Sequence, residues 1–184
     1  MRKKKKERIE EIIIIPENAK IEIDDGIKIS GKKGDLRKEI KDKDIFLEKK
    51  NNQLIIYSKN NSKRLKKKIC SIKAHVKNMI NGVMENHYYR LKICSSHFPM
   101  NVSIEHDKFI VKNFLGEKVP RILKLNKNSK IKIEGSEILI EDCDKESASQ
   151  TAADIEQLCR IRNRDRRVFQ DGIFIINKDG REIK

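Results

Sequence analysis

The sequence predicts an α+β fold of two tandem duplicated domains, each an antiparallel β-sheet with one α-helix packed on one face. Isoleucine-rich segments alternate apolar and charged residues, as strands with one buried face do. The same order of such segments occurs twice, and each copy is followed by one helical pattern. Matching positions lie 82 to 86 residues apart, as Pro16 and Pro99 or Ile45 and Ile131 illustrate. This internal repeat indicates two similar domains, residues 1–86 and 87–184.

The first domain is predicted to contain a series of short strands. The β-branched run Ile12–Ile15 forms the first strand and is ended by Pro16. Residues 21–23 and 27–29 alternate around Asp25-Gly26, which predicts a hairpin, and Gly31–Gly34 predicts the next tight turn. Two more strands are predicted at residues 45–47 and 54–56.

The second domain repeats this pattern and then extends it. Tyr89, Leu91 and Ile93 alternate with polar residues and predict its first strand. Asp171-Gly172 opens an additional short strand, Ile173–Ile176, after the second helix. The other strands of this domain are predicted around residues 104, 109–111, 131–133 and 138–140.

Two segments have helical periodicity. The first is Ser62–Met84, with one apolar stripe made of Leu65, Ile69, Ile72, Val76, Met79 and Val83. The second is predicted to begin near Ser147 with a capping box that includes Gln150. Its expected buried stripe is Ala148, Ala152, Ile155 and either Leu158 or Cys159. Glu141, Asp142, Asp144 and Glu146 precede or open it and suit a helix N-terminus.

The chain is strongly basic, with a formal net charge of +15 and a pI near 9.7. Charge of this size attracts polyanions, so nucleic acid is the first partner to expect and an anionic membrane surface the second. Residues 2–8, RKKKKER, form a basic tail that we expect to be disordered unless RNA orders it. No run is long enough to span a bilayer, so a soluble, intracellular protein is expected.

No constellation of residues supports an enzyme. The four histidines lack metal-site spacing, and the four cysteines contain no CxxC pair, which leaves neither a metal nor a cofactor site. Ser95-Ser96-His97 places hydroxyl groups beside an imidazole, but the G-x-S-x-G elbow of serine hydrolases is absent. We therefore interpret His97 as a packed or RNA-facing residue, and the cysteines as reduced and structural.

A cluster of arginines follows the second helix: Arg160, Arg162, Arg164, Arg166 and Arg167. Only Asp165 offsets this charge, and Phe169 follows at once. The rigid guanidinium fork matches phosphate geometry, so the cluster suits an RNA backbone; the alternative is a solvated basic turn. Arg167 could instead pair with an internal carboxylate such as Asp171.

Several motifs resemble a known family. They are His75-Val76 with Asn78-Met79-Ile80 and Gly82-Val83, His97-Phe98-Pro99 with Asn101, Asn113–Lys118, and the series Gln157, Ile161, Arg164, Arg167, Phe169, Asp171-Gly172-Ile173, Ile175 and Lys178. With these motifs the chain resembles the universal large-subunit ribosomal protein six family, in its eukaryotic form, from Ile14 to Lys178. Phe174 and Lys32 depart from it, since the family usually has tyrosine and proline there.

The resemblance implies an rRNA-binding structural component of the large ribosomal subunit, near the stalk base and the elongation-factor site. Residues 87–184 would be the main rRNA-binding domain. The expected partners are large-subunit rRNA and neighbouring ribosomal proteins. The expected location is the cytoplasm and, during assembly, the nucleolus. No catalysis, cofactor, metal, membrane or small-molecule substrate is expected. The alternative is a free RNA-binding assembly factor with the same fold. The expected rRNA contacts are Lys112, Asn113, Lys118, Arg121, Arg160, Arg162, Arg164, Arg166, Arg167 and Lys178.

Overall fold

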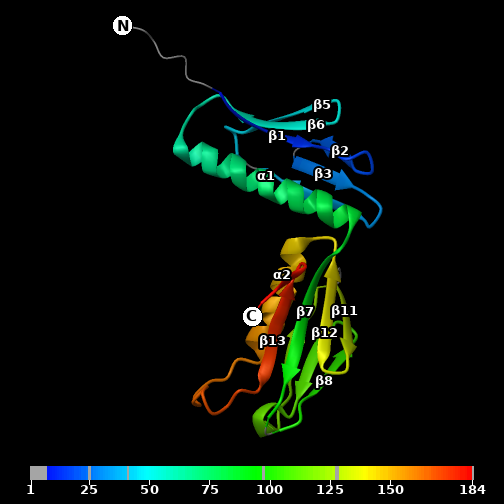
Figure 1. Cartoon of the computed structure of the whole chain (residues 1–184), viewed down its shortest axis with the longest axis vertical. Helices are drawn as coiled ribbons and strands as arrows, with labels where there is room; N and C mark the ends of the chain where they lie inside the picture. Colours follow the sequence, from blue (N-terminus) through cyan, green and yellow to red (C-terminus); the bar gives the residue numbers. More distant parts are fainter. Residues whose placement is uncertain (1–7, 25, 41, 97, 127–128, 184) are drawn as a thin grey trace. The chain divides into compact units, whose positions relative to one another are not determined.

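The computed structural model describes residues 8–24, 26–40, 42–96, 98–126 and 129–183 (Figure 1). The chain divides into two compact units, Met1–Asn86 and His87–Lys184, each with its own hydrophobic core. Of the expected basic tail only Arg8 is described, and His97 also lies outside the described residues.

The described residues of the first unit form six strands and one helix. The sheet β1-β6-β5 and the sheet β2-β3-β4 are both antiparallel. The elements are β1 (Ile9–Ile14), β2 (Lys20–Ile23), β3 (Gly26–Ser30), β4 (Asp35–Glu39), β5 (Phe46–Lys50), β6 (Gln53–Ser58) and α1 (Lys63–Met84).

The second unit repeats this order and adds two strands after its helix. The sheet β10-β9-β8 has three strands, and the sheet β11-β12-β7-β13-β14 has five. The elements are β7 (His87–Cys94), β8 (Asn101–Glu105), β9 (Lys108–Lys112), the short 3-10 helix η1 (Phe114–Gly116), β10 (Arg121–Lys124), β11 (Lys130–Glu134), β12 (Glu137–Asp142), α2 (Lys145–Leu158), β13 (Gly172–Lys178) and β14 (Arg181–Glu182).

The topology confirms the predicted duplication. The pairing β1-β6-β5 of the first unit corresponds to β7-β12-β11 of the second, and β2-β3-β4 corresponds to β8-β9-β10. In the second unit β13 pairs with the free side of β7, which has no described counterpart at β1. The second copy is therefore extended after α2 by a loop and the strands β13 and β14.

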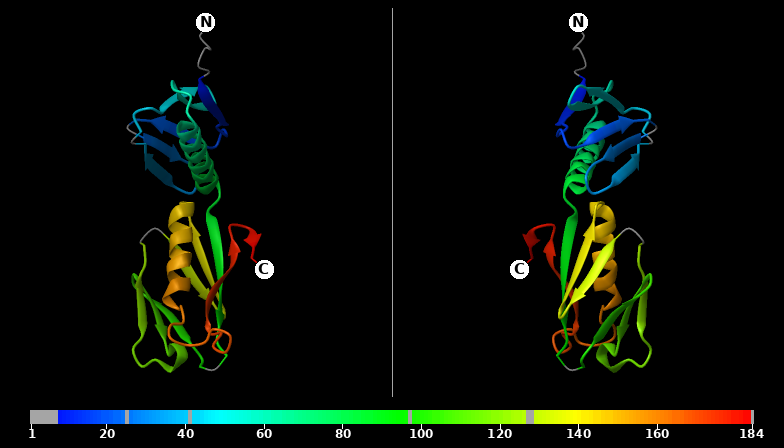
Figure 2. Two further views of the ribbon diagram at one scale, coloured as in Figure 1. Left: turned by 90° about the vertical axis from the view of Figure 1, so that its left-hand side faces the viewer. Right: turned by 90° about the vertical axis from the view of Figure 1, so that its right-hand side faces the viewer.

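The α+β class is confirmed, but the strands of each unit form two sheets rather than one. α2 packs against β7, β12 and β13 of the larger sheet and against β10 of the smaller one (Figure 2). α1 likewise contacts β1 and β6 of one sheet and β3 and β4 of the other. The apolar stripe of each helix therefore joins its two sheets around one core.

The helix boundaries agree with the sequence at α1 and differ at α2. Ser62 caps α1, because its Oγ accepts the Leu65 N–H at 3.2 Å. The predicted capping box at Ser147 is wrong: α2 begins at Lys145, and the Asp144 carboxylate accepts the Glu146 N–H at 3.0 Å. Asp144 already supplies the cap, and Ser147 lies in the first turn, where its hydroxyl contacts Ser129 Oγ at 3.2 Å.

All four cysteines are free, and they differ sharply in exposure. Cys70 is exposed on α1, whereas Cys159 is 3 % exposed, and burial raises the pKa of its thiol to about 12. We expect iodoacetamide at about pH 8 to alkylate Cys70 in the folded protein and to spare Cys159, because the thiolate is the nucleophile. Peptide mass spectrometry checks this; equal labelling of both before urea is added would contradict the buried position of Cys159.

Neither described helix has the length and apolar composition needed to cross a membrane.

Candidate nucleic-acid interface

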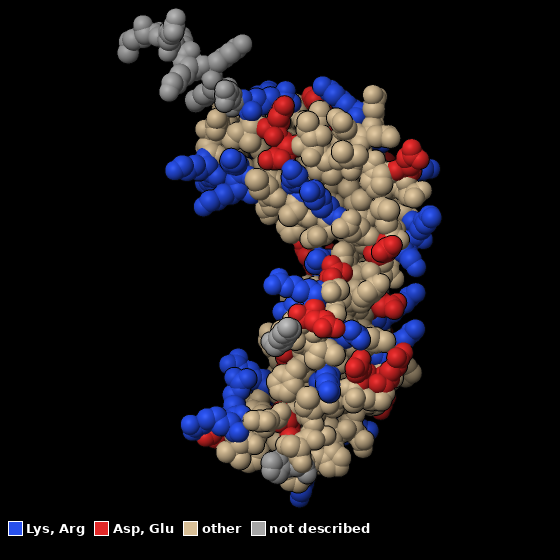
Figure 3. All heavy atoms as spheres, viewed as in Figure 1, with Lys and Arg blue, Asp and Glu red and all other residues tan. Residues whose placement is uncertain are grey.

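The arginine loop, residues 160–171, connects α2 to β13 and carries five exposed arginines. Asn163 has a positive φ of 57°, a conformation that asparagine tolerates and that turns the chain sharply within the loop. In Figure 3 basic side chains project at the lower left, over the loop that Figure 1 draws in orange. The loop is thus a surface feature that presents guanidinium groups to the surroundings of the second unit.

A second loop, residues 112–118, carries the basic residues Lys112 and Lys118, both exposed. It turns tightly, with φ of 60° at Asn113, 50° at Leu115 and 78° at Gly116. Phe114 and Leu115 point into the core, so the loop is anchored by its apolar residues. Asn113 Nδ2 also donates to the Pro99 carbonyl at 3.1 Å.

Arg121 joins the two loops. Its Nε and Nη2 donate to the two carboxylate oxygens of Glu117 at 2.8 and 2.6 Å. Its Nη1 donates to the carbonyl of Leu158 at 2.6 Å and to that of Arg160 at 3.3 Å. The Leu158 carbonyl ends α2 and lacks an intrahelical partner, which makes it a natural acceptor for a cation.

These contacts bring the 112–118 loop and the arginine loop to one end of the second unit, here called the basic end. The side chain of Arg121 is 23 % exposed, and its guanidinium lies 4.2 Å from the ring centroid of Phe114. The Arg121 hydrogen bond lowers the pKa of the Glu117 carboxyl, so this pair is ionised near neutral pH. Arg121 therefore has an internal bracing role, and its expected RNA contact stays a prediction.

Inside the arginine loop the side chains differ in what they contact. Arg164 lies 4.9 Å from the ring centroid of Phe169. Arg167 pairs with Asp165, with Nη2 to Oδ2 at 2.8 Å, and this hydrogen bond lowers the pKa of the Asp165 carboxyl. The suggested pairing of Arg167 with Asp171 is therefore wrong. Asp171 is buried and accepts hydrogen bonds from the Ser96 N–H, at 2.6 Å, and from the Ser96 hydroxyl.

Both units match one known family. The model of the family described as ribosomal protein L6 matches residues 15–86 and 98–172, a segment in each copy of the duplicated unit. The chain belongs to the ribosomal protein L6 family.

Curated members of the L6 family are similar over nearly the whole chain. The large ribosomal subunit protein uL6 of Aeropyrum pernix is 37% identical over 175 residues, 94% of this chain and 94% of that protein. Those of Staphylothermus marinus and Nanoarchaeum equitans are each 40% identical, over 91% and 93% of this chain and 93% and 94% of their own lengths. These relatives are archaeal, and the eukaryotic form suggested by the motifs stays a prediction.

The structure does not bring Lys178 to the basic end of this L6-family chain. Lys178 is the last residue of β13, opposite Tyr89 near the start of β7, whereas Gly172 at the other end of β13 lies opposite Cys94. A strand rises about 3.3 Å per residue, so Lys178 lies roughly 20 Å from the end of the arginine loop. The other nine predicted residues gather at the basic end; Lys178 would need a separate RNA contact.

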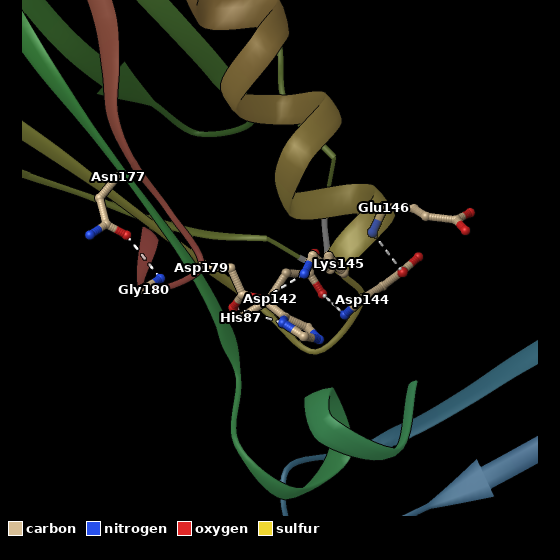
Figure 4. Close-up of polar contacts among 8 residues, drawn as sticks. All are labelled: His87, Asp142, Asp144, Lys145, Glu146, Asn177, Asp179 and Gly180. Atoms are coloured by element: carbon tan, nitrogen blue, oxygen red, sulfur yellow. Dashed lines mark hydrogen bonds and ion pairs between the residues drawn. The ribbon is translucent and has the colours of Figure 1, made fainter. Parts of the chain in front are cut away.

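The neighbourhood of Lys178 is held by an ion-pair network (Figure 4). Asp179 accepts from Lys145 Nζ at 2.7 Å and contacts His87 Nδ1 at 2.9 Å, and His87 is almost fully buried. Desolvation raises the pKa of the Asp179 carboxyl, but the hydrogen bonds from Lys145 and His87 outweigh it and leave the pKa lowered. This network joins the start of α2 to β7 and β13.

We expect Asp179→Asn to cost about 1–3 kcal/mol of unfolding free energy at pH 7, because Lys145 and His87 lose an ionised acceptor. Asparagine tolerates the positive φ of 52° at this position, so the backbone is not strained. A lowered pKa stabilises the fold above the unfolded pKa, roughly 4, and this stabilisation is lost as the pH falls through the folded value. Urea unfolding should therefore show a smaller difference in unfolding free energy between the unaltered chain and Asp179→Asn at about pH 3 than at pH 7. A difference that does not change with pH would contradict an ionised Asp179.

Among the residues that the structure describes, no three His, Cys, Asp or Glu side chains gather so that they could hold a metal ion.

Proposed function

We propose that this chain is a structural constituent of the large ribosomal subunit and that its basic end binds large-subunit rRNA. The names of its curated relatives, large ribosomal subunit protein uL6, support the first part. One observation carries the second part: Arg121 fixes the 112–118 loop against the end of α2, beside the arginine loop. Basic residues from two separate segments then lie at the same end of the second unit.

The chemistry of this surface suits the phosphate backbone. Within the described part of the chain, the guanidinium groups of Arg160, Arg162 and Arg166 have no ion-pair partner, and their side chains are exposed. Arginine forks bind phosphate oxygens bidentately, and neutralised phosphates release counterions. We expect these contacts to recognise RNA by shape and charge, because phosphate contacts carry no base sequence.

We further propose that this surface lies near the stalk base and the elongation-factor site, and that the protein supports cytoplasmic translation through contacts with rRNA and neighbouring ribosomal proteins. We propose a structural function and no catalytic one, because the family is one of ribosomal proteins. A free assembly factor with the same fold is the alternative.

Sedimentation of cell extract through a sucrose gradient separates these two functions. A ribosomal constituent should co-migrate with mature large subunits and stay there after a high-salt wash. A protein found only in the free pool, or only with immature particles, would refute the proposal in favour of the assembly factor.

A further inference from the structure

We propose that a groove beside the arginine loop holds one unpaired nucleotide of the bound RNA, with its base stacked on Phe174. This inference rests on the proposed function and adds a specific ligand to it. The groove, here called the β13 groove, runs from the end of α2 past the start of β13 to the end of β7. Its wall includes Ser95, Arg160, Arg166, Phe169, Gln170 and Phe174.

The β13 groove is large enough for this ligand. Its volume is about 950 Å³, and sites for small organic ligands have volumes of roughly 300–1,000 Å³. It exists because the second copy of the unit differs from the first, in that β13 follows the arginine loop. Among the described residues, the outer side of β13 is paired in its second half, where Asn177 and Lys178 pair with β14 and the Ile176 carbonyl accepts the Ile183 N–H at 2.9 Å. The first half of β13 therefore forms a sheet edge beside the groove.

Phe174 offers a flat apolar surface in the groove. Phe174 is 39 % exposed, so part of this large apolar residue is open to a ligand. The ring folds back over Gly172, since a Cβ built at Gly172 would lie only 2.8 Å from Phe174 Cζ. Base stacking on aromatic side chains is the usual means by which proteins hold unpaired RNA bases.

The charges around the groove favour a nucleotide over an apolar side chain. Arg160 and Arg166 are exposed at its wall and can bind the phosphate of a nucleotide whose base enters. Three cations of the wall, Lys92, Arg160 and Arg166, outnumber its two carboxylates, Asp171 and Glu156. These carboxylates accept hydrogen bonds inside the unit, from the Ser96 N–H at 2.6 Å and from the Ile175 N–H at 3.2 Å.

The hydroxyl and amide groups of the wall suit the polar edge of a base. Ser95 and Gln170 are exposed, and each can donate and accept hydrogen bonds. Ile173 and Cys159, 1 % and 3 % exposed, belong to the core between α2 and β13, on the opposite face of the strand from Phe174. The groove thus combines a stacking surface, polar groups for a base edge and cations for a phosphate.

The test uses the full chain and two fluorescein-labelled RNA duplexes of the same sequence, one with a single unpaired adenosine at its centre. Fluorescence anisotropy should give roughly tenfold tighter binding of the bulged duplex, because one base stacks on an aromatic ring. Phe174→Ala should abolish this preference and leave the affinity for the paired duplex unchanged. Phe174→Tyr keeps the ring and should keep the preference, and thermal unfolding checks that both variants fold.

Equal affinity of the unaltered chain for both duplexes would overturn the nucleotide site, as would a preference that survives Phe174→Ala. These results would leave the proposed function intact, provided that replacing Arg162, Arg164 and Arg166 with glutamine weakens binding of both duplexes. If those replacements change neither affinity, the RNA-binding basic end itself is wrong.

Discussion

Replacing Arg162, Arg164 and Arg166 together with glutamine is expected to weaken binding to large-subunit rRNA by on the order of 100-fold at about 0.15 M salt. At that salt concentration, counterion release at each neutralised phosphate strengthens binding about fivefold, and the effects of three such phosphates multiply. The slope of log K against log salt should become shallower by about one for each phosphate that is no longer neutralised. These side chains are exposed, so the unfolding free energy should change little.

A matched control separates a defined site from general charge attraction. Lys63, Arg64 and Lys67 are exposed at the start of α1 in the first unit. Replacing them with glutamine removes three positive charges, as many as the loop variant loses. Filter binding or anisotropy over a salt series should show a near-normal affinity and slope for this control. Equal losses of affinity in the two triple variants would mean that the arginine loop acts only through the net charge of the chain.

The second large effect is expected at Arg121. Arg121→Ala should lower the unfolding free energy by about 2–3 kcal/mol, because it leaves the Glu117 carboxylate and the terminal carbonyl of α2 without their cation. Arg121→Lys should recover little of this stability, because an ammonium group cannot donate bidentately to Glu117 and also reach Leu158. Urea unfolding at pH 7 measures both variants.

The pH dependence of this effect has a definite sign. Arg121 lowers the pKa of Glu117, so the stabilisation is present above the unfolded pKa of roughly 4.3 and is lost as the pH falls through the folded value. The difference in unfolding free energy between the unaltered chain and Arg121→Ala should thus be smaller at about pH 3 than at pH 7. Arg37→Ala, an exposed change on β4, should cost less than about 0.5 kcal/mol; a cost equal to that of Arg121→Ala would contradict the bracing role.

The repeated architecture could be predicted from sequence because apolar alternation directly encodes a half-buried strand. Ile21 and Ile29, which the pattern places on one buried face, are paired across β2 and β3 and are 2 % and 0 % exposed. The pattern fails where a strand is short and charged. β4 has the sequence DLRKE and β10 has RILK, so neither shows a clear period, and both were missed.

The parts of the site that were missed depend on interactions between distant segments. The Glu117–Arg121 pair is four residues apart and could have been noticed, but the hydrogen bond from Arg121 to the end of α2 spans 37 residues. The sequence allows Asp171 as a partner for Arg167, but Ser96, 75 residues away from Asp171, donates to it instead. The sequence motif places Lys178 close to the arginines, whereas the extended strand β13 carries it to the other end of the unit.

The position of the basic end against rRNA can be measured by ultraviolet cross-linking of purified large subunits, followed by nuclease digestion and peptide mass spectrometry. Peptides that contain the 112–118 loop and the arginine loop should carry nucleotide adducts, and an adduct on Phe174 or Phe169 would also place a base in the β13 groove. Recovery of both loops unmodified, with adducts only on peptides of the first unit or of β11 and β12, would contradict the proposed interface.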